Sequence, residues 1–289
     1  MTEIPIKCMP IIKVSGDIAA QTSDSVAIEE PLEIRLEFGP PGERRVQNIS
    51  VTMRTPGHDS ELAIGFLFTE GIVRNNKDIA TVSHCFMPCT QNRENIIQVE
   101  LNEAIMPDLQ SMTRNFYTTS SCGVCGKGSI SAIRTVCGFA EQKNDQFRLD
   151  AGLLLRLPDI LKQHQAVFAD TGGLHASALF NKSGELLLVR EDVGRHNALD
   201  KLIGYAFNKN WLPLRENVLL LSGRASFELV QKAAMAGINI IASIGAPSSM
   251  AVELAEEFNI TLAGFLRNRR FNIYSAAYRI LLPAYENTM

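Results

Sequence analysis

Two cysteines, Cys122 and Cys125, stand three positions apart in the glycine-rich run CGVCG, the sharpest chemical feature of the sequence. Thiols at this spacing can form a disulfide, share a metal ion or pass a sulfur atom onward. The surrounding residues 118–130, TTSSCGVCGKGSI, offer little apolar material to bury, which predicts an exposed and mobile loop. Lys127 is a nearby cation that favours the thiolate form of the pair.

Each of the three uses needs different surroundings. A structural zinc site needs four ligands, and the other close pair, Cys85 with Cys89 beside His84, has an irregular spacing for one. A thioredoxin-type disulfide needs a helix N-terminus, whose dipole lowers the thiol pKa, whereas glycines surround this pair. A persulfide carrier needs a reactive thiolate on an accessible loop, which the glycines favour. Cys8 and Cys137 are interpreted as small packing residues, since free cysteine is often buried. Cys85 and Cys89 could form a second redox pair, but packing or incidental exposure is the preferred interpretation.

A second group of ionisable side chains lies in residues 170–175, DTGGLH, and residues 190–197, REDVGRHN. His175, Arg195 and His196 stand here around glycines at a predicted strand-to-helix junction. Burial of such groups costs free energy unless they pair with one another or with a ligand. The pattern therefore indicates either a salt-bridge network or a binding site, and the residues alone leave both open.

Small residues follow two further predicted strands, in SGRAS at 222–226 and APSS at 246–249, and each run begins a predicted helix. Backbone N–H groups at helix starts bind phosphate, and ligands of α/β sheets lie beyond the carboxyl ends of the strands. Neither GxxxxGK[ST] nor GxGxxG is present. The pattern still favours a nucleotide or pyrophosphate ligand, with these candidate residues at one edge: Ser222, Gly223, Arg224, Ser248, Arg267, Arg269 and Arg270.

The elements that position these groups follow from length, composition and periodicity. The chain has 289 residues, 46% hydrophobic and 20% charged, which is typical of a soluble globular protein of about two domains. Residues 1–30 carry little signal. Alternating apolar residues and a GPPG turn predict a hairpin, a later strand and a helix capped by Asp59 or Ser60, giving a small α+β domain over residues 31–117. Residues 118–145 form the predicted loop and linker.

Residues 146–289 predict an α/β domain in which strands and helices alternate. Such alternation favours a sheet covered by helices on both faces, with parallel pairing in its second half. The apolar stretch 233–252 is interrupted by Gly, Pro, Asn and Ser, which suits a helix end, a strand and a turn rather than a membrane span. The expected helices are 151–163, 197–207, 226–236 and 248–258, and the expected strands are 175–180, 185–190, 217–221, 238–243 and 260–266.

The charge balance limits the partners. Lys and Arg number 28 and Asp and Glu 31, so the net charge of −3 argues against bulk binding of nucleic acid or an anionic membrane. The first residues, MTEIPIKCMP, contain no apolar segment after a basic start. We therefore expect a cytoplasmic protein with reduced thiols.

Several blocks together resemble, in order, those of the FdhD/NarQ family, the accessory sulfurtransferases of formate dehydrogenase. They are CGVCG at 122–126, GLHA at 173–176, EDVGRH at 191–196 with ALDK at 198–201, SGRAS at 222–226 with VQKA at 230–233, and TLAGF at 261–265. The resemblance covers the chain from about residue 31 and implies an α/β fold whose second domain is a three-layer domain similar to cytidine deaminase. Zinc deaminases use HxE. The run HAS at 175–177 lacks that glutamate, so neither deamination nor zinc is expected.

The resemblance implies a sulfur carrier that accepts persulfide sulfur from a cysteine desulfurase and passes it to Mo-bis(molybdopterin guanine dinucleotide), the cofactor of formate dehydrogenase. It assigns the persulfide to Cys122 and an assisting role to Cys125. A guanine nucleotide such as GDP is the expected mimic of the cofactor, and a homodimer is the expected assembly. A competing hypothesis is a chaperone that holds the cofactor without covalent chemistry. The family's cofactor-binding stretch matches Phe265, Leu266, Arg267, Asn268, Arg269 and Arg270.

Overall fold

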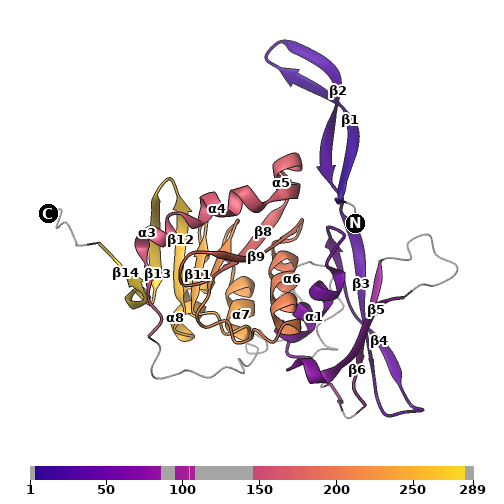
Figure 1. Ribbon diagram of the computed structural model, residues 1–289. Coiled ribbons are helices and arrows are strands. Elements are labelled where there is room, and N and C mark those ends of the chain that lie inside the picture. Colours follow the sequence, from indigo (N-terminus) through magenta and orange to yellow (C-terminus); the bar gives the residue numbers. More distant parts are fainter. Residues whose placement is uncertain (1–3, 86–94, 104, 108–145, 284–289) are drawn as a thin grey trace.

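A six-stranded sheet forms the centre of the larger part of the molecule (Figure 1). The computed structural model describes residues 4–85, 95–103, 105–107 and 146–283. In the sheet order β13-β12-β11-β10-β8-β9, the strands β10, β11 and β12 run parallel, as the alternation predicted, and the other neighbours run antiparallel. The strands are β8 (His175–Phe180), β9 (Leu186–Asp192), β10 (Val218–Leu221), β11 (Ile240–Ser243), β12 (Thr261–Arg267) and β13 (Arg270–Ser275).

Helices cover both faces of this sheet, which confirms the sequence expectation. Successive strand residues point to opposite faces, and in β10 Leu219 and Leu221 join one buried cluster while Val218 and Leu220 join another. The first cluster includes α6 (Arg195–Asn208), α7 (Phe227–Met235) and α8 (Ser249–Glu257). The second includes α3 (Ala151–Leu154) and α4 (Leu157–His164). Whether this layering follows cytidine deaminase stays a prediction.

The single helix expected over residues 151–163 is wrong, because the chain breaks between α3 and α4. Pro158 has no N–H to bond the carbonyl of Leu154, and its ring would clash with that carbonyl in a continuous helix. Pro158 is accommodated instead in the first turn of α4. A further short helix, α5 (Ala166–Thr171), was not expected and ends at Gly172, whose φ is 65°.

A four-stranded sheet in the order β4-β3-β6-β5 carries one helix, α1 (Asp59–Thr69). The predicted hairpin is confirmed by the antiparallel pair β3 (Glu30–Phe38) and β4 (Arg45–Arg54), and the later strand by β6 (Ile96–Leu101). The expected cap at Asp59 or Ser60 is wrong, because the residue before the helix is His58, which makes no capping bond. Asp59 binds Arg54 instead, at 2.9 and 3.0 Å. The remaining short elements are β5 (Ile79–His84), η1 (Asn76–Asp78), η3 (Ala277–Arg279) and the pair β7 (Leu149–Asp150) and β14 (Ile280–Leu281).

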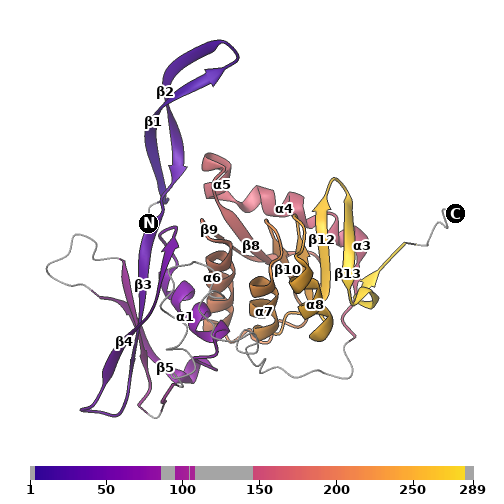
Figure 2. The same cartoon turned by 180° about the vertical axis from the view of Figure 1, so that it is seen from behind.

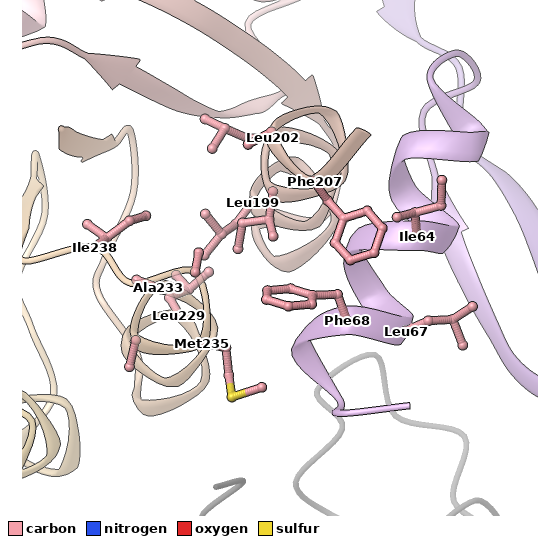
Figure 3. Close-up of a cluster of buried hydrophobic side chains, with 14 of the residues drawn as sticks. Ile64, Leu67, Phe68, Leu199, Leu202, Phe207, Leu229, Ala233, Met235 and Ile238 are labelled. Carbon is pink, nitrogen blue, oxygen red and sulfur yellow. The ribbon is translucent and has the colours of Figure 1, made fainter. Parts of the chain in front are cut away.

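Helices α1 and α6 pack at a crossing that only glycine permits. A Cβ on Gly65 would lie 1.9 Å from the carbonyl oxygen of Asp200, and one on Gly204 would lie 1.9 Å from that of Glu61. The rings of Phe68 and Phe207 meet near this crossing with centroids 5.4 Å apart (Figure 3). The smaller sheet and the larger one therefore share one hydrophobic core. The domain boundaries expected at 117 and 145 lie outside the described residues.

Within the first thirty residues, whose structure the sequence left open, residues 6–27 form a hairpin that stands out from the rest of the molecule (Figures 1 and 2). It consists of β1 (Ile6–Ser15) and β2 (Ile18–Ala27). Cys8 is exposed on β1, so its interpretation as a packing residue is wrong: most of this hairpin has no core to pack against. In the described part of the chain, no helix combines the length and apolarity that a membrane crossing requires.

Candidate functional site

One edge of the six-stranded sheet gathers the loops that the sequence singled out. Strands β10, β11 and β12 end there. Because β8 is antiparallel to β10 and β9 is antiparallel to β8, β8 begins at this edge and β9 ends there. His175 opens β8 directly opposite Asp192, the last residue of β9. Ligands of such sheets lie at this edge.

Hydrogen bonds join the three loops after β10, β11 and β12 into one surface. Ser222 accepts a hydrogen bond on Oγ from the Ala176 N–H at 2.8 Å. The Gly245 N–H donates to the Gly223 carbonyl, and the Phe265 N–H donates to the Gly245 carbonyl, both at 2.9 Å. A Cβ on Gly245 would lie 3.0 Å from the Gly223 oxygen, so glycine is needed where these loops approach. The structure thus brings the 222–224 loop and the start of the 265–270 segment together through residue 245.

The serines of the two helix starts differ in what they do. Ser248 is exposed, and its Oγ caps α8 by accepting a hydrogen bond from the Ala251 N–H at 3.3 Å. Ser226 precedes α7 without capping it, and its Oγ lies 3.4 Å from Nε2 of His196. Arg224 is exposed between them. The Ser248 hydroxyl is therefore already engaged, whereas Ser226 contributes to the group around His196.

The segment 265–270 forms a tight turn between β12 and β13. Asn268 and Arg269 have φ values of 53° and 54°, as in the two-residue turns that connect antiparallel strands. The four residues from Arg267 to Arg270 are exposed, and the Arg267 guanidinium lies 5.9 Å from the centroid of the Phe265 ring. Leu266 is buried in the core, so its side chain cannot reach a ligand and only its backbone is available.

His175, Arg195 and His196 lie close together at this edge. The pKa of half-buried His175 is lowered by burial and then by the charges of Arg195 and His196, with Asp192 acting against them. His196 Nε2 lies 3.8 Å from a carboxylate oxygen of Glu228, and this contact lowers the pKa of Glu228 to about 2. The cluster therefore combines an imidazole whose pKa is lowered by burial with an arginine and a second imidazole.

The acidic members of the 190–197 segment are structural. Asp192 accepts hydrogen bonds from Lys201 at 2.7 Å and from the backbone of Gly194 and Thr55 at 2.8 and 3.2 Å. Glu191 accepts two backbone hydrogen bonds from the first turn of α5. The salt-bridge interpretation is thus correct for Asp192, which ties the end of β4 to α6.

Sequence reasoning missed Ser177. This serine is 1% exposed, and its Oγ has no hydrogen-bond partner among the described residues. It follows His175 by two positions in β8, so both side chains point to the same face of the sheet. The available signal was a hydroxyl inside the otherwise apolar strand ASALF.

The CGVCG cysteines, Cys122 and Cys125, lie outside the described residues, as do Cys89 and Cys137. Cys85 is partly buried and its thiol donates to Gln98 Oε1 at 3.4 Å. Within the described ranges, no three His, Cys, Asp or Glu side chains are grouped so as to hold a metal ion.

Comparison with known proteins gives concordant results. Residues 27–281 match the model of the FdhD/NarQ family. A protein named "Sulfur carrier protein FdhD" from Mycobacterium tuberculosis is 49% identical over 271 residues, covering 92% of this chain and 95% of that protein. Proteins of the same name from Streptomyces coelicolor and Picrophilus torridus are 46% and 44% identical, covering 95% and 90% of this chain and 95% and 93% of theirs.

A solved structure shows the same fold. The crystal structure of a putative formate dehydrogenase accessory protein from Desulfotalea psychrophila matches with a TM-score of 0.71 at 24% identity, covering 96% of this chain and 99% of that one. The arrangement of sheets described above is therefore found in a protein of quite different sequence.

Proposed function

This chain belongs to the FdhD/NarQ family, and on that basis we propose that it is a sulfur carrier for formate dehydrogenase. It takes persulfide sulfur from a cysteine desulfurase and transfers it to Mo-bis(molybdopterin guanine dinucleotide). The observation that carries the proposal is the CGVCG pair in a chain 43–50% identical to proteins named sulfur carriers. The proposal includes action as a homodimer in the cytoplasm.

Loading of sulfur is a thiol exchange. The Cys122 thiolate attacks the outer sulfur of the donor persulfide, a new S–S bond forms, and the bond within the donor breaks. The donor leaves as a thiolate and Cys122 becomes a persulfide. Lys127, five residues along the chain, favours the thiolate that begins this step.

Delivery needs the transferred sulfur as sulfide, which is two electrons more reduced. The Cys125 thiolate attacks the inner sulfur of the Cys122 persulfide, so that a Cys122–Cys125 disulfide forms and sulfide leaves to the molybdenum. A dithiol reductant then regenerates both thiols. The second cysteine of the run thereby supplies the two electrons.

The edge of the six-stranded sheet supports the proposed acceptor. Its loops supply helix starts and an exposed arginine turn, which suit the guanine nucleotide and pyrophosphate groups of that substrate. In this proposal the acceptor is held by the 222–224 loop, by the 265–270 segment and by the cluster of His175, Arg195 and His196. The two-sided helical layering of the sheet is the feature that a cytidine-deaminase-like arrangement requires.

Persulfide measurement tests the proposal. The purified chain is incubated with a cysteine desulfurase and cysteine, alkylated and analysed by mass spectrometry of the peptide containing Cys122. We expect one added sulfur on Cys122 in the wild type and none in Cys122→Ala. Unchanged sulfur loading of the Cys122→Ala chain would overturn the assignment.

The alternative is a chaperone that binds the cofactor without covalent chemistry, which the preformed sheet edge also supports. Replacement of both Cys122 and Cys125 by serine separates the two. A chaperone with both serines still restores formate dehydrogenase activity in cells lacking the native gene, whereas a sulfur carrier does not.

A further inference from the structure

The end of α6 places the only tryptophan of the chain on the molecular surface. Asn210, just past the helix, has a φ of 56°, and its N–H donates to the Phe207 carbonyl at 3.0 Å. The Trp211 N–H donates to the Ala206 carbonyl at 2.9 Å. These two bonds form a Schellman motif, in which the residue after the left-handed one packs back on the last turn of the helix. Trp211 does so against Tyr205, with ring centroids 5.4 Å apart.

This helix end does not account for the size or the exposure of Trp211. A leucine at position 211 satisfies the same contact, whereas the tryptophan leaves 40% of its surface open to water. Exposed apolar surface costs free energy. Tryptophan and tyrosine are also enriched at the centres of protein interfaces. A single exposed ring is common on a protein surface, so the residues around it decide its role.

Exposed cations surround this pair of rings. Lys209 packs over the same tyrosine, with its Nζ 5.7 Å from the ring centroid. The Asn76 amide donates to Asn210 Oδ1 at 2.6 Å, which joins η1 and its exposed cations Arg74 and Lys77 to the end of α6. Within the described part of the chain, no carboxylate pairs with these three cations. Their charges are therefore available to a partner.

The carboxylates of the same loops do not cancel this charge. Asp78 is buried and accepts two backbone N–H groups of its own turn, at 2.7 and 3.2 Å. Arg215 and Glu216 are neighbours of opposite charge and add no net charge, so Glu103 is one exposed carboxylate against the three cations. On a chain whose net charge is −3, this surface is locally positive. We call it the Trp211 surface, and it consists of Arg74, Lys77, Tyr205, Lys209 and Trp211.

The Trp211 surface lies far from the acceptor edge of the sheet. Helix α6 has 14 residues and begins at that edge with Arg195, so its other end is about 20 Å away. The side chain of Asn102 donates to the Lys77 carbonyl at 2.6 Å, and residues 105–107, shortly after it, directly precede the part of the sequence that contains the CGVCG run. A partner on the Trp211 surface therefore lies where the chain enters that part, and it leaves the acceptor edge free.

We propose that the Trp211 surface docks the sulfur donor of this carrier, a protein that presents an acidic surface with an apolar centre. Trp211 is the apolar anchor, and the three cations steer and orient the donor. The proposal deepens the proposed function and rests on it, because it names where the cysteine desulfurase binds. None of these five residues belongs to the acceptor site or to the CGVCG run.

The single tryptophan makes docking directly observable. The full-length chain is labelled with 5-fluorotryptophan, so that Trp211 gives one ¹⁹F NMR signal, and is titrated with a purified cysteine desulfurase. We expect the signal to shift or broaden, and the change to be reversed at about 0.5 M sodium chloride, where surface charges are screened. An unchanged signal in a mixture that loads Cys122 with sulfur would overturn the docking site.

Variants separate the anchor from the charges. Trp211→Leu keeps the apolar contact of the helix end, and the double variant Lys77→Gln with Lys209→Gln removes two charges. The matched control is Lys13→Gln with Lys162→Gln, because both lysines are exposed, on β1 and α4, away from this surface (Figure 1). By biolayer interferometry, affinity for the desulfurase is expected to fall about tenfold or more in Trp211→Leu and about threefold or more in the double variant. The control is expected to bind like the wild type.

Loading rates distinguish docking from chemistry. Persulfide on Cys122 is followed by mass spectrometry with two donors, the desulfurase with cysteine and inorganic polysulfide. The Cys122 thiolate attacks the terminal sulfur of polysulfide, a new S–S bond forms and a shorter polysulfide leaves, so this reaction needs no docking. We expect Trp211→Leu to load more slowly than the wild type from the desulfurase and at the wild-type rate from polysulfide.

Each failure has its own signature. Wild-type affinity and loading in both Trp211→Leu and the double lysine variant would overturn the docking site alone. A change in the molar mass of Trp211→Leu by light scattering would assign this surface to a second copy of the chain and would also overturn it. A wild-type chain that gains no persulfide on Cys122 from either donor would instead refute the proposed function.

Discussion

Asp192 and Lys201 form an ion pair of 2.7 Å in which both side chains are buried. Lys201 also donates to the Thr55 carbonyl at 2.8 Å, and the Thr55 N–H donates back to Asp192 at 3.2 Å. The EDVGRH block therefore serves two purposes. Its aspartate attaches the smaller sheet to α6, while Arg195, three residues later, remains unpaired among the described residues at the edge of the larger sheet.

Removing one partner of this pair is expected to destabilise the chain strongly. Asp192→Asn leaves the Lys201 ammonium buried without a counterion, which costs about 3–5 kcal/mol in comparable cases. Urea unfolding measures the loss. The double variant Asp192→Asn with Lys201→Met removes both charges and is expected to recover part of it. A single variant that loses less than about 1 kcal/mol would show that the pair does not fasten the two sheets.

The crossing of α1 and α6 predicts that a methyl group is not tolerated at Gly65. The added carbon would lie 1.9 Å from the carbonyl oxygen of Asp200, so the helices must separate. We expect Gly65→Ala to lose at least about 1–3 kcal/mol by thermal or urea unfolding. Gly173→Ala is the matched control, because the nearest atom to a Cβ there is 3.9 Å away. Equal stability of the two variants would contradict the close packing of these helices.

The contact between His196 and Glu228 predicts a stability change in acid. The pKa of Glu228 is lowered from an ordinary value of 4.5 to about 2, chiefly by His196. A lowered folded-state pKa stabilises the fold above pH 4.5, and this contribution disappears as the pH falls toward 2. Because Glu228 is only partly buried, the effect is on the order of 1 kcal/mol. The difference in melting temperature between wild type and Glu228→Gln should therefore shrink from pH 6 to pH 2, and a constant difference would contradict it.

The order of strands and helices in the larger part was predictable because its residues obey local rules. Strand β10 is a continuous apolar run, and the Ser residues before α7 and α8 mark helix starts. The break between α3 and α4 has an equally local cause, because Pro158 cannot lie in the interior of a continuous helix. The prediction of a single helix over 151–163 did not take this proline into account. The N-terminal hairpin was not predictable in this way, because most of both its faces is exposed and no hydrophobic period marks it.

The chemistry of the site was predictable by residue type but not by role. His175, Arg195 and Asp192 carried the same signal in the sequence, namely an ionisable group near a glycine. Their roles diverge only through partners far along the chain, such as Thr55, which lies 137 residues before Asp192. Ser177 gave almost no signal, because a serine within a strand is ordinary until its burial and lack of a partner are known.

The exposure of Cys8 gives a prediction that corrects the sequence interpretation. Its thiol lies on the projecting hairpin and is open to solvent, whereas Cys85 is partly buried and its thiol is hydrogen-bonded to Gln98. Native alkylation with iodoacetamide, followed by peptide mass spectrometry, should label Cys8 before Cys85. Cys8→Ser is expected to leave the melting temperature within about 1 °C of wild type, since exposed substitutions rarely exceed ±0.5 kcal/mol. Slower labelling of Cys8 than of Cys85 would contradict the exposed position.

The proposed chemistry predicts different failures for the two cysteines of the CGVCG run. Cys125→Ser keeps the Cys122 nucleophile, so the persulfide should form on Cys122 at the wild-type level, but sulfide release stops because no thiolate attacks the inner sulfur. Cys122→Ser should fail at loading. Both steps are followed on one sample, by mass spectrometry for the persulfide and by methylene blue for released sulfide after loading. Cys8→Ser serves as the control for losing one thiol. Sulfide release by Cys125→Ser, after the cysteine used for loading is removed and with no thiol added, would contradict the role of Cys125 as the internal reductant and would assign the two electrons to another thiol of the chain.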